Sequence, residues 1–412
     1  MRTSSIRSVR GRAVVSTALG MLLVGIASVP AHAETIRSKQ WHLDAMGAEK
    51  IWKLSTGKGV TVAVIDSGVD KQNPDLLGQV LDGKNLAPDK AGDEHTDYQG
   101  HGTGMAGLIA GTGKSGGGDG AFGLAPDVKI LPVRVPGADK GKGSQKAADV
   151  EFNKIAPDAI RYAVDSGAKV INISMGFREG SPQLTEAVKY ALDKNSLIFA
   201  SVGNSGHEGN HFEYPAATPG VVGVGAIDKN LKKTKVSQYG PQVDVVAPGD
   251  KMVHACGGKT GLCESGGTSD ATALASATAA LIWSKHPDWT NNQVLKVMLN
   301  TVSGSTTGEK RSDFIGYGAL RPLRALKSPG DPGPADVYPL PDLAAAEAKS
   351  PSPQASSPAS TGTGTDKASS TPVADSQESG GKTGLWIGLG VAAAVLVGAA
   401  VAVPLVRGRR SA

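Results

Sequence analysis

Short apolar runs alternate with longer stretches of small or amphipathic residues through the middle of the chain. Residues 59–65 form a near-continuous β-branched run, which is typical of a parallel strand covered on both faces. Residues 271–283 are small, apolar and free of glycine and proline, which predicts a buried helix. Strands that alternate with helices predict an α/β fold of three layers, with a mostly parallel central sheet and helices on both faces. The predicted strands are 59–65, 128–135, 169–176, 197–202, 221–227 and 243–247, the predicted helices are 155–166, 184–194, 271–283 and 291–300, and residues 137–148 are predicted to form an exposed loop.

The two ends of the chain carry different apolar segments. Residues 1–33 combine arginines, an apolar run and Ala31-His32-Ala33, which is the order of a secretory signal peptide cleaved before Glu34. Residues 385–406 are about twenty residues without a charge, enough to cross roughly 30 Å of hydrocarbon as a helix. The alternative for this segment is a buried core helix. The arginines of the tail, 407–412, instead favour a single membrane span with the C-terminus in the cytoplasm and the preceding chain outside the cell.

Composition divides the rest of the chain into two parts. Residues 328–384 are dominated by Pro, Ser, Ala, Thr and Gly, and such a stretch cannot bury enough apolar surface to offset its ordering entropy. We therefore predict a disordered linker there. Residues 34–327 remain, a length that suits one large α/β domain in which 34–55 form an N-terminal extension.

Charge and cysteine content narrow the possible partners. The formal net charge of +5 is modest, so nothing indicates a nucleic-acid partner. The two cysteines, Cys256 and Cys263, lie in an exported domain and are predicted to form a disulfide, with two free thiols as the alternative. Two cysteines are too few for a structural zinc site of the usual kind, and no calcium-loop spacing occurs. We predict no cofactor and no metal site.

Three polar residues stand where predicted elements begin or end. Asp66 follows the strand 59–65, and functional groups of open parallel sheets lie just beyond such strand ends. His101 stands among glycines at the head of a small-residue helix, without the second histidine of a zinc protease. Ser269 falls at the N-terminus of the helix 271–283, where backbone N–H groups can stabilise an oxyanion. Taken alone, Ser269 is better explained as an ordinary N-cap, and Asp66 is equally explained as a cap of the next turn.

The three residues lie in motifs that follow one another in the order Asp, His, Ser. The motifs are V-I-D-S-G at 64–68, H-G-T-G-M-A-G at 101–107 and G-T-S-D-A at 267–271. This is one of the known chain orders in which an acid, a base and a nucleophile assemble for acyl transfer. All three motifs resemble those of the subtilisin-like serine proteases. The resemblance implies that Ser269 is the nucleophile, His101 the general base and Asp66 the group that orients the imidazole.

The same resemblance implies further residues of the site. Asn204 matches the asparagine of the family's oxyanion hole, with an ordinary turn residue as the alternative. Ser174, Met175 and Gly176 resemble the segment that pairs with an extended substrate, although a plain strand end explains them equally well. The remaining predicted substrate-binding residues are Ala200, Ser201, Val202 and Gly203.

A narrower resemblance covers most of the chain. Residues 40–46, the cysteine-bearing loop before Ser269, residues 316–318 and the Pro-rich linker with one membrane helix look like the mycosins, membrane-anchored subtilases tied to type VII secretion. It implies an N-terminal segment that lies along the domain, because the residues between the predicted cleavage site and Asp66 are too few for the folded inhibitory pro-domain of typical secreted subtilases. The chain departs from the common subtilase pattern at three positions, and a single disulfide is fewer than a typical mycosin has. The departures are Gly104, Asp270 and Ala273.

These observations support two hypotheses of different classes. The favoured one is a cell-surface serine endopeptidase that cleaves exported proteins. The alternative is a subtilase-shaped structural component that stabilises a secretion complex and whose cleavage is dispensable. The sequence leaves the substrate, the calcium content and the effect of Asp270 open.

Overall fold

A computed structural model describes residues 35–136, 144–258, 260–304 and 310–349. The predicted signal peptide, the predicted membrane span 385–406 and the tail 407–412 lie outside these residues. Within the described part of the chain, no helix combines the length and the apolar character needed to cross a membrane.

The centre of the fold is a seven-stranded sheet in the order β2-β3-β1-β4-β5-β6-β7, in which every pairing is parallel. Strands β4 to β7 are buried along their whole length, as expected for β-branched and apolar runs covered on both faces. The strands are β1 (Thr61–Asp66), β2 (Lys84–Asn85), β3 (Lys129–Arg134), β4 (Val170–Ile173), β5 (Leu197–Ser201), β6 (Val222–Ile227) and β7 (Val245–Pro248).

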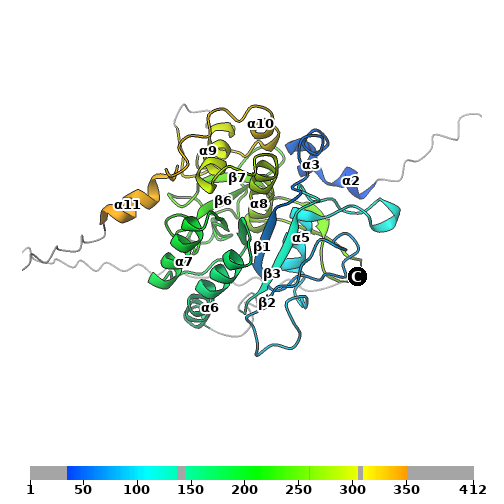
Figure 1. The fold of residues 1–412 in the computed structure, drawn as a ribbon. Coiled ribbons are helices and arrows are strands. Elements are labelled where there is room, and N and C mark those ends of the chain that lie inside the picture. The colour runs from blue at the N-terminus through cyan, green and yellow to red at the C-terminus, as the bar shows by residue number, and fades with distance from the viewer. Residues whose placement is uncertain (1–34, 137–143, 259, 305–309, 350–412) are drawn as a thin grey trace, which may run out of the picture. The chain divides into compact units, whose positions relative to one another are not determined.

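Helices cover both faces of this sheet and create two hydrophobic cores. The core on one face is formed with α5 (His101–Ala110), α8 (Thr268–Lys285), α9 (Asn291–Thr301) and α10 (Pro322–Lys327). The core on the other face is formed with α6 (Gln145–Asp165) and α7 (Pro182–Asp193), which Figure 1 shows side by side. The predicted three-layer α/β architecture is therefore present in the described residues.

Helix α8 passes through the first of these cores. Nearly all its residues from Thr268 to Trp283 are buried, and most of them are Ala or Thr. Small side chains allow a helix to approach strands closely, and α8 contacts β4, β5, β6 and β7 as well as α5. The N-terminus of α8 is consequently held at the carboxyl ends of the strands.

Two of the differences from the predicted elements concern the loop 137–148 and the segment before α8. Helix α6 begins at Gln145, inside the predicted loop 137–148, because Ser144 caps it by accepting a hydrogen bond from Ala147 N at 3.3 Å. An antiparallel pair, β8 (Met252–Ala255) and β9 (Leu262–Ser265), precedes α8 and was not predicted. Strand β9 is short and largely exposed, so its sequence lacks the apolar run on which the strand prediction depends.

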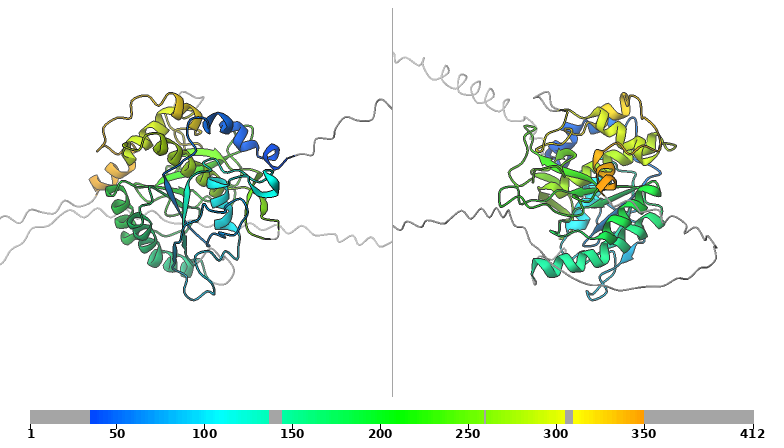
Figure 2. Two further views of the ribbon diagram at one scale, coloured as in Figure 1. Left: turned by 45° about the vertical axis from the view of Figure 1, so that its right-hand side comes forward. Right: turned by 90° about the vertical axis from the view of Figure 1, so that its left-hand side faces the viewer.

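The N-terminal extension lies against the domain, as the resemblance implied. The buried Gln40 side chain donates through Nε2 to Phe122 O at 2.8 Å and to Val253 O at 3.0 Å. Trp41 Nε1 donates to Asp250 O at 2.9 Å. Figure 2 shows these helices in dark blue beside α10, with which α4 is in contact. The helices are α2 (Ile36–Lys39), α3 (Trp41–Met46) and α4 (Ala48–Ile51).

The ordered part of the chain extends past residue 327, where the sequence analysis placed the start of a disordered linker. Leu340 is 2% exposed, and Asp342 Oδ2 accepts a hydrogen bond from Gly220 N at 2.8 Å. Helix α11 (Pro341–Lys349) follows. The composition of 328–384 as a whole is polar, and the prediction of a linker relied on that composition. It therefore missed the single buried side chain of Leu340.

Candidate active site

Asp66 and His101 form a direct hydrogen-bonded pair at the carboxyl end of β1. Asp66 is the last residue of β1 and its side chain is fully buried, whereas His101 is the first residue of α5 and its side chain is 36% exposed. His101 Nδ1 donates to Asp66 Oδ1 at 2.8 Å, and the same oxygen accepts Ser67 N at 2.8 Å. Because Nδ1 is committed to the carboxylate, Nε2 is the ring atom available for proton transfer.

The negative charge of Asp66 dominates the electrostatics of this ring. It raises the pKa of His101 to about 9, against the opposing effect of burial, and the hydrogen bond that His101 donates to Asp66 also raises this pKa. Asp270 and Asp97 add smaller contributions that also raise this pKa. The imidazolium form is therefore strongly favoured, and the neutral base form becomes dominant only at alkaline pH.

Ser269 lies in the first turn of α8, after the helix N-cap Gly267. Its Oγ donates to Ser174 O at 3.0 Å, and Ser174 Oγ donates to Ser269 O at 3.1 Å. Ile65 and Ile173 are register partners in β1 and β4, so Ser174 and Asp66 follow neighbouring positions at one edge of the sheet. The three predicted catalytic residues thus lie at the same edge. In the part of the chain that the structure describes, no hydrogen bond joins Ser269 Oγ to His101.

Asn204 lies next to the first turn of α8. Its Oδ1 accepts Thr268 N at 2.9 Å and Thr268 Oγ1 at 3.1 Å, which fixes the side-chain amide against the helix start. Among the described residues, Asn204 Nδ2 donates to no other group. The N–H of Ser269 belongs to the first helical turn, which offers no intrahelical acceptor for it. Both predicted oxyanion donors are therefore uncommitted.

The side chains of the predicted substrate-binding segments are largely packed away from a substrate, since Met175, Ala200 and Val202 lie in a hydrophobic core. Ala200 is paired with β4 and β6 inside the sheet, and Val202 N donates to Val224 O at 3.2 Å, so the backbone of Ser174–Gly176 is the part of these segments that can pair with a substrate. This arrangement suits addition of an extended peptide strand. Ser201 is also buried, at the end of β5.

A carboxylate that the sequence analysis did not single out lies between these segments. A Cβ atom built on Gly176 would meet Glu213 Oε2 at 1.7 Å, and one built on Gly203 would meet Glu213 Cδ at 2.6 Å. Gln238 Nε2 donates to Glu213 Oε1 at 2.7 Å. A side chain at Gly176 would require the Glu213 carboxylate to move, whereas Gly203 also has a φ of +105°, a conformation that favours glycine. Glu213 stands outside every motif, and no local signal marks it.

A second histidine and carboxylate, His254 and Asp270, are joined through the hydroxyl of Ser265. His254 Nε2 is 2.7 Å from Ser265 Oγ, and Ser265 Oγ is 2.6 Å from Asp270 Oδ2. His254 and Asp270 are each 2% exposed. His254 Nδ1 donates to Ala255 O at 2.8 Å, because a carbonyl oxygen can only accept.

The hydroxyl of Ser265 has one proton but two close contacts, so it donates one hydrogen bond and accepts the other. The proton of the accepted bond in this bridged pair belongs either to His254 or to Asp270. Either a charged His254 donates to Ser265 and Ser265 donates to an ionised Asp270, or a protonated Asp270 donates to Ser265 and Ser265 donates to a neutral His254. Burial raises the pKa of Asp270, while the nearby His254 and the hydrogen bond from Ser265 lower it.

Two departures from the common subtilase pattern are explained by this bridged pair. A Cβ built on Gly104 would lie 2.9 Å from His254 Cε1, so the glycine makes room for the buried ring. Asp270 is the carboxylate that the ring reaches through Ser265. Gly104 and Asp270 therefore belong to one structural feature. The structure gives no comparable account of Ala273.

The cysteines close the loop between β8 and β9. Cys256 and Cys263 form a disulfide with a sequence separation of 7, as the sequence analysis predicted. Strand β9 leads directly into the glycine turn before Ser269. The disulfide thus braces the hairpin that supplies both His254 and Ser265.

Known proteins resemble the chain in sequence and in fold. The profile of the Subtilase family matches residues 57–318. Subtilisin BL of Lederbergia lenta is 36% identical over 253 residues, which cover 61% of this chain and 87% of that protein. The crystal structure of MycP1 from Mycobacterium smegmatis has a TM-score of 0.63 and 27% identity, covering 73% of this chain and 87% of that one. MycP3 protease from the type VII (ESX-3) secretion system has a TM-score of 0.59 and 31% identity, covering 70% of this chain and 88% of that one.

Proposed function

The chain belongs to the Subtilase family, and from this premise we propose that Asp66, His101 and Ser269 are the catalytic triad of a membrane-anchored protease associated with type VII secretion. Family membership makes the protein a subtilisin-like serine endopeptidase. The observation that carries the triad assignment is the 2.8 Å hydrogen bond between His101 and Asp66, at the same sheet edge as Ser269.

In the proposed mechanism His101 Nε2 takes the proton of Ser269 Oγ as this oxygen attacks the peptide carbonyl. Ser269 Oγ must first leave Ser174 O, its acceptor in the resting structure. Asp66 keeps the proton on Nδ1 and stabilises the imidazolium that forms. His101 then returns its proton to the leaving amine, and water repeats the sequence to release the acyl group.

The oxyanion of the tetrahedral intermediate is bound by Asn204 Nδ2 and Ser269 N. The contacts of Asn204 with Thr268 support this role, because an amide fixed before reaction stabilises charge without reorganisation. The substrate backbone extends along Ser174–Gly176, in register with the catalytic serine.

Covalent labelling with a fluorophosphonate probe tests the nucleophile. The purified full-length protein is expected to form an adduct at Ser269, and Ser269→Ala is expected to abolish it. Ser284→Ala is the matched control, because it removes a hydroxyl from the far end of the same helix. An adduct that persists in folded Ser269→Ala would exclude the assignment.

The membrane anchor and the extracellular location follow from residues 385–406 and the basic tail. The secretion partner is supported by the likeness to MycP1 and to MycP3 of a type VII system. Extraction tests this part: the full chain is expected to resist alkaline carbonate, whereas a chain ending at residue 384 is expected to enter the soluble fraction. Release of the full chain by carbonate would contradict the anchor.

A second candidate function is a structural role in which cleavage is dispensable. The observation that favours it is the resting position of Ser269 Oγ on Ser174 O instead of His101. Complementation separates the two candidates. Secretion restored to a deletion strain by Ser269→Ala supports the structural role, and secretion that requires Ser269 supports proteolysis.

A further inference from the structure

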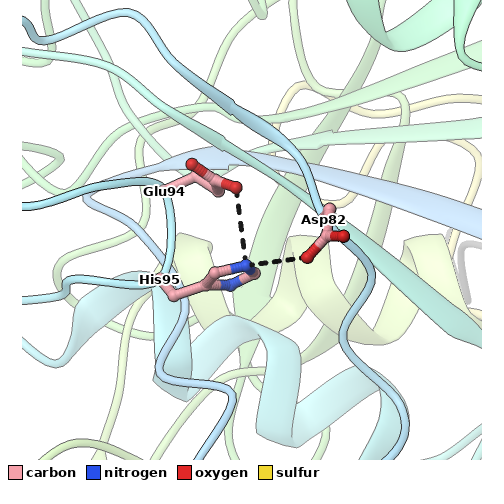
Figure 3. A group of neighbouring side chains, drawn as sticks. All are labelled: Asp82, Glu94 and His95. Atoms are coloured by element: carbon pink, nitrogen blue, oxygen red, sulfur yellow. Dashed lines mark ion pairs between the residues drawn. The ribbon is translucent and has the colours of Figure 1, made fainter.

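His95, on the loop that precedes α5, points a ring nitrogen at the carboxylates of Glu94 and Asp82 (Figure 3). His95 Nε2 is 3.4 Å from Glu94 Oε1 and 3.5 Å from Asp82 Oδ1. The His95 side chain is only 8% exposed, whereas that of Glu94 is 19% exposed and that of Asp82 94% exposed. A nearly buried imidazole is therefore directed at two acidic groups on the solvent side.

Ordinary ion pairing does not account for this arrangement. Charge-assisted hydrogen bonds between a nitrogen and a carboxylate oxygen are about 2.7–2.9 Å long, shorter than both separations at His95. Neither ring nitrogen of His95 has a hydrogen-bond partner among the described residues. Buried polar atoms are normally satisfied, so an unpartnered Nε2 that points at two carboxylates supports a ligand site.

The same separations fit the edges of a metal coordination polyhedron. Zinc binds histidine nitrogen and carboxylate oxygen at about 2.0–2.2 Å, and a tetrahedron of such bonds has edges of about 3.4 Å. We propose that Asp82, Glu94 and His95 form a three-ligand site for a divalent transition metal ion, best matched by Zn²⁺. The fourth position faces solvent on the side of the exposed Asp82 and is completed by water.

The donor set distinguishes this ion from calcium. An imidazole ligand suits zinc and its transition-metal neighbours, whereas Ca²⁺ takes six to eight oxygen ligands. A lysine competes for Asp82, since Lys71 Nζ lies 3.8 Å from Asp82 Oδ1. Both side chains are exposed, so this contact contributes little and a metal ion displaces it.

The backbone around the site is fixed by hydrogen bonds that do not involve the imidazole. Gly83 N donates to Glu94 Oε1 at 3.3 Å, and Val69 N donates to Glu94 O at 3.0 Å. Arg134 Nη1 donates to Asp93 O at 3.1 Å. An ion bound here would join the segment before β2 to the loop that packs on the turn after Asp66. The expected role is structural, and the proposal is independent of the triad assignment.

Metal titration of the full-length chain after removal of metals by a chelator tests the proposal. We expect one equivalent of Zn²⁺ to bind by calorimetry and Co²⁺ to give the intense visible absorption of four-coordinate geometry. Zn²⁺ is also expected to raise the thermal unfolding temperature, whereas Ca²⁺ at the same concentration is expected to leave it unchanged.

Matched variants locate the site. His95→Ala and Glu94→Gln are expected to weaken Zn²⁺ binding at least tenfold, by loss of a ligand. His207→Ala is the control, because His207 Nε2 lies 3.1 Å from Glu208 Oε1 on the surface without a second carboxylate. The proposal is overturned by wild-type Zn²⁺ affinity in folded His95→Ala, by the absence of stoichiometric binding, or by a preference for Ca²⁺.

Discussion

The candidate active site has two buried carboxylates, Asp66 and Asp270, and each is linked to a histidine in a different way. Asp66 contacts His101 directly, and that ring is 36% exposed. Asp270 is linked to His254 through the hydroxyl of Ser265, and His254 is buried, with 2% exposure. The chemical groups are the same, so access to substrate decides which pair can transfer a proton to it. In the proposed mechanism the direct pair acts in catalysis, and we expect the bridged pair to have a structural role.

The two pairs also differ in how they hold charge. The direct pair strongly favours a charged imidazole, because the charge of the Asp66 carboxylate raises the pKa of His101 and Nδ1–H donates to this carboxylate with no hydroxyl in between. The bridged pair keeps one shared proton, whose position sets whether Asp270 is charged. Asp270 also raises the pKa of His101. The charge of the buried pair therefore affects the pKa of the exposed histidine.

The largest expected effect comes from breaking the direct pair. Asp66→Asn replaces the acceptor of Nδ1–H by an amide that can hold the wrong tautomer, and we expect kcat to fall about ten-thousand-fold. Hydrolysis of a peptide substrate measures this. A loss below about tenfold would show that the direct pair is dispensable.

Loss of an oxyanion donor is the next largest effect. Asn204→Ala is expected to lower kcat by about a hundred- to a thousand-fold, because the developing charge loses one fixed donor. Steady-state kinetics should show the change in kcat with KM nearly constant. A change confined to KM would instead assign Asn204 to substrate binding.

Breaking the bridged pair should affect stability more than catalysis. Ser265→Ala removes the only hydroxyl between His254 and Asp270 and leaves buried polar atoms without partners, at a cost of about 1–3 kcal/mol in the free energy of unfolding. Urea unfolding measures this cost, with the exposed Ser284→Ala as control. Equal stability of the two variants would contradict the structural role.

The smallest expected effect is a shift in the pH dependence of kcat/KM, which tests whether the bridged pair acts on the direct pair. The neutral form of His101 is the base, so kcat/KM should rise with pH toward a midpoint near the raised pKa of about 9. Asp270→Asn removes a nearby negative charge that favours the imidazolium, and it should therefore lower this pKa and move the midpoint to lower pH. A midpoint that stays in place would show that Asp270 does not act on His101.

The direct pair was predictable from the sequence, whereas the bridged pair was not. Asp66, His101 and Ser269 each follow a local signal: a strand end, a glycine-rich helix start and a glycine turn before a helix. His254 carries no such signal, because its environment is created by the pairing of β8 with β9 and by the packing of α5. Gly104 and Asp270 were visible only as isolated departures.

Some elements of the fold were likewise predictable from the sequence, and others were not. Strands with β-branched runs, such as β1, were predicted because both of their faces are buried. The exposed strand β9 and the anchored Leu340 were missed, because the first lacks an apolar pattern and the second is surrounded by residues typical of a linker. Contacts between distant segments determine both features.

The most direct test makes one chemical change at both histidines. The rate at which a fluorophosphonate labels Ser269 is measured in His101→Gln and in His254→Gln, with circular dichroism to establish that each variant is folded. We expect labelling to be lost in His101→Gln and retained within about tenfold in His254→Gln, because only the exposed ring can act as the base. Labelling that survives in His101→Gln, or that is lost equally in a folded His254→Gln, would contradict the account.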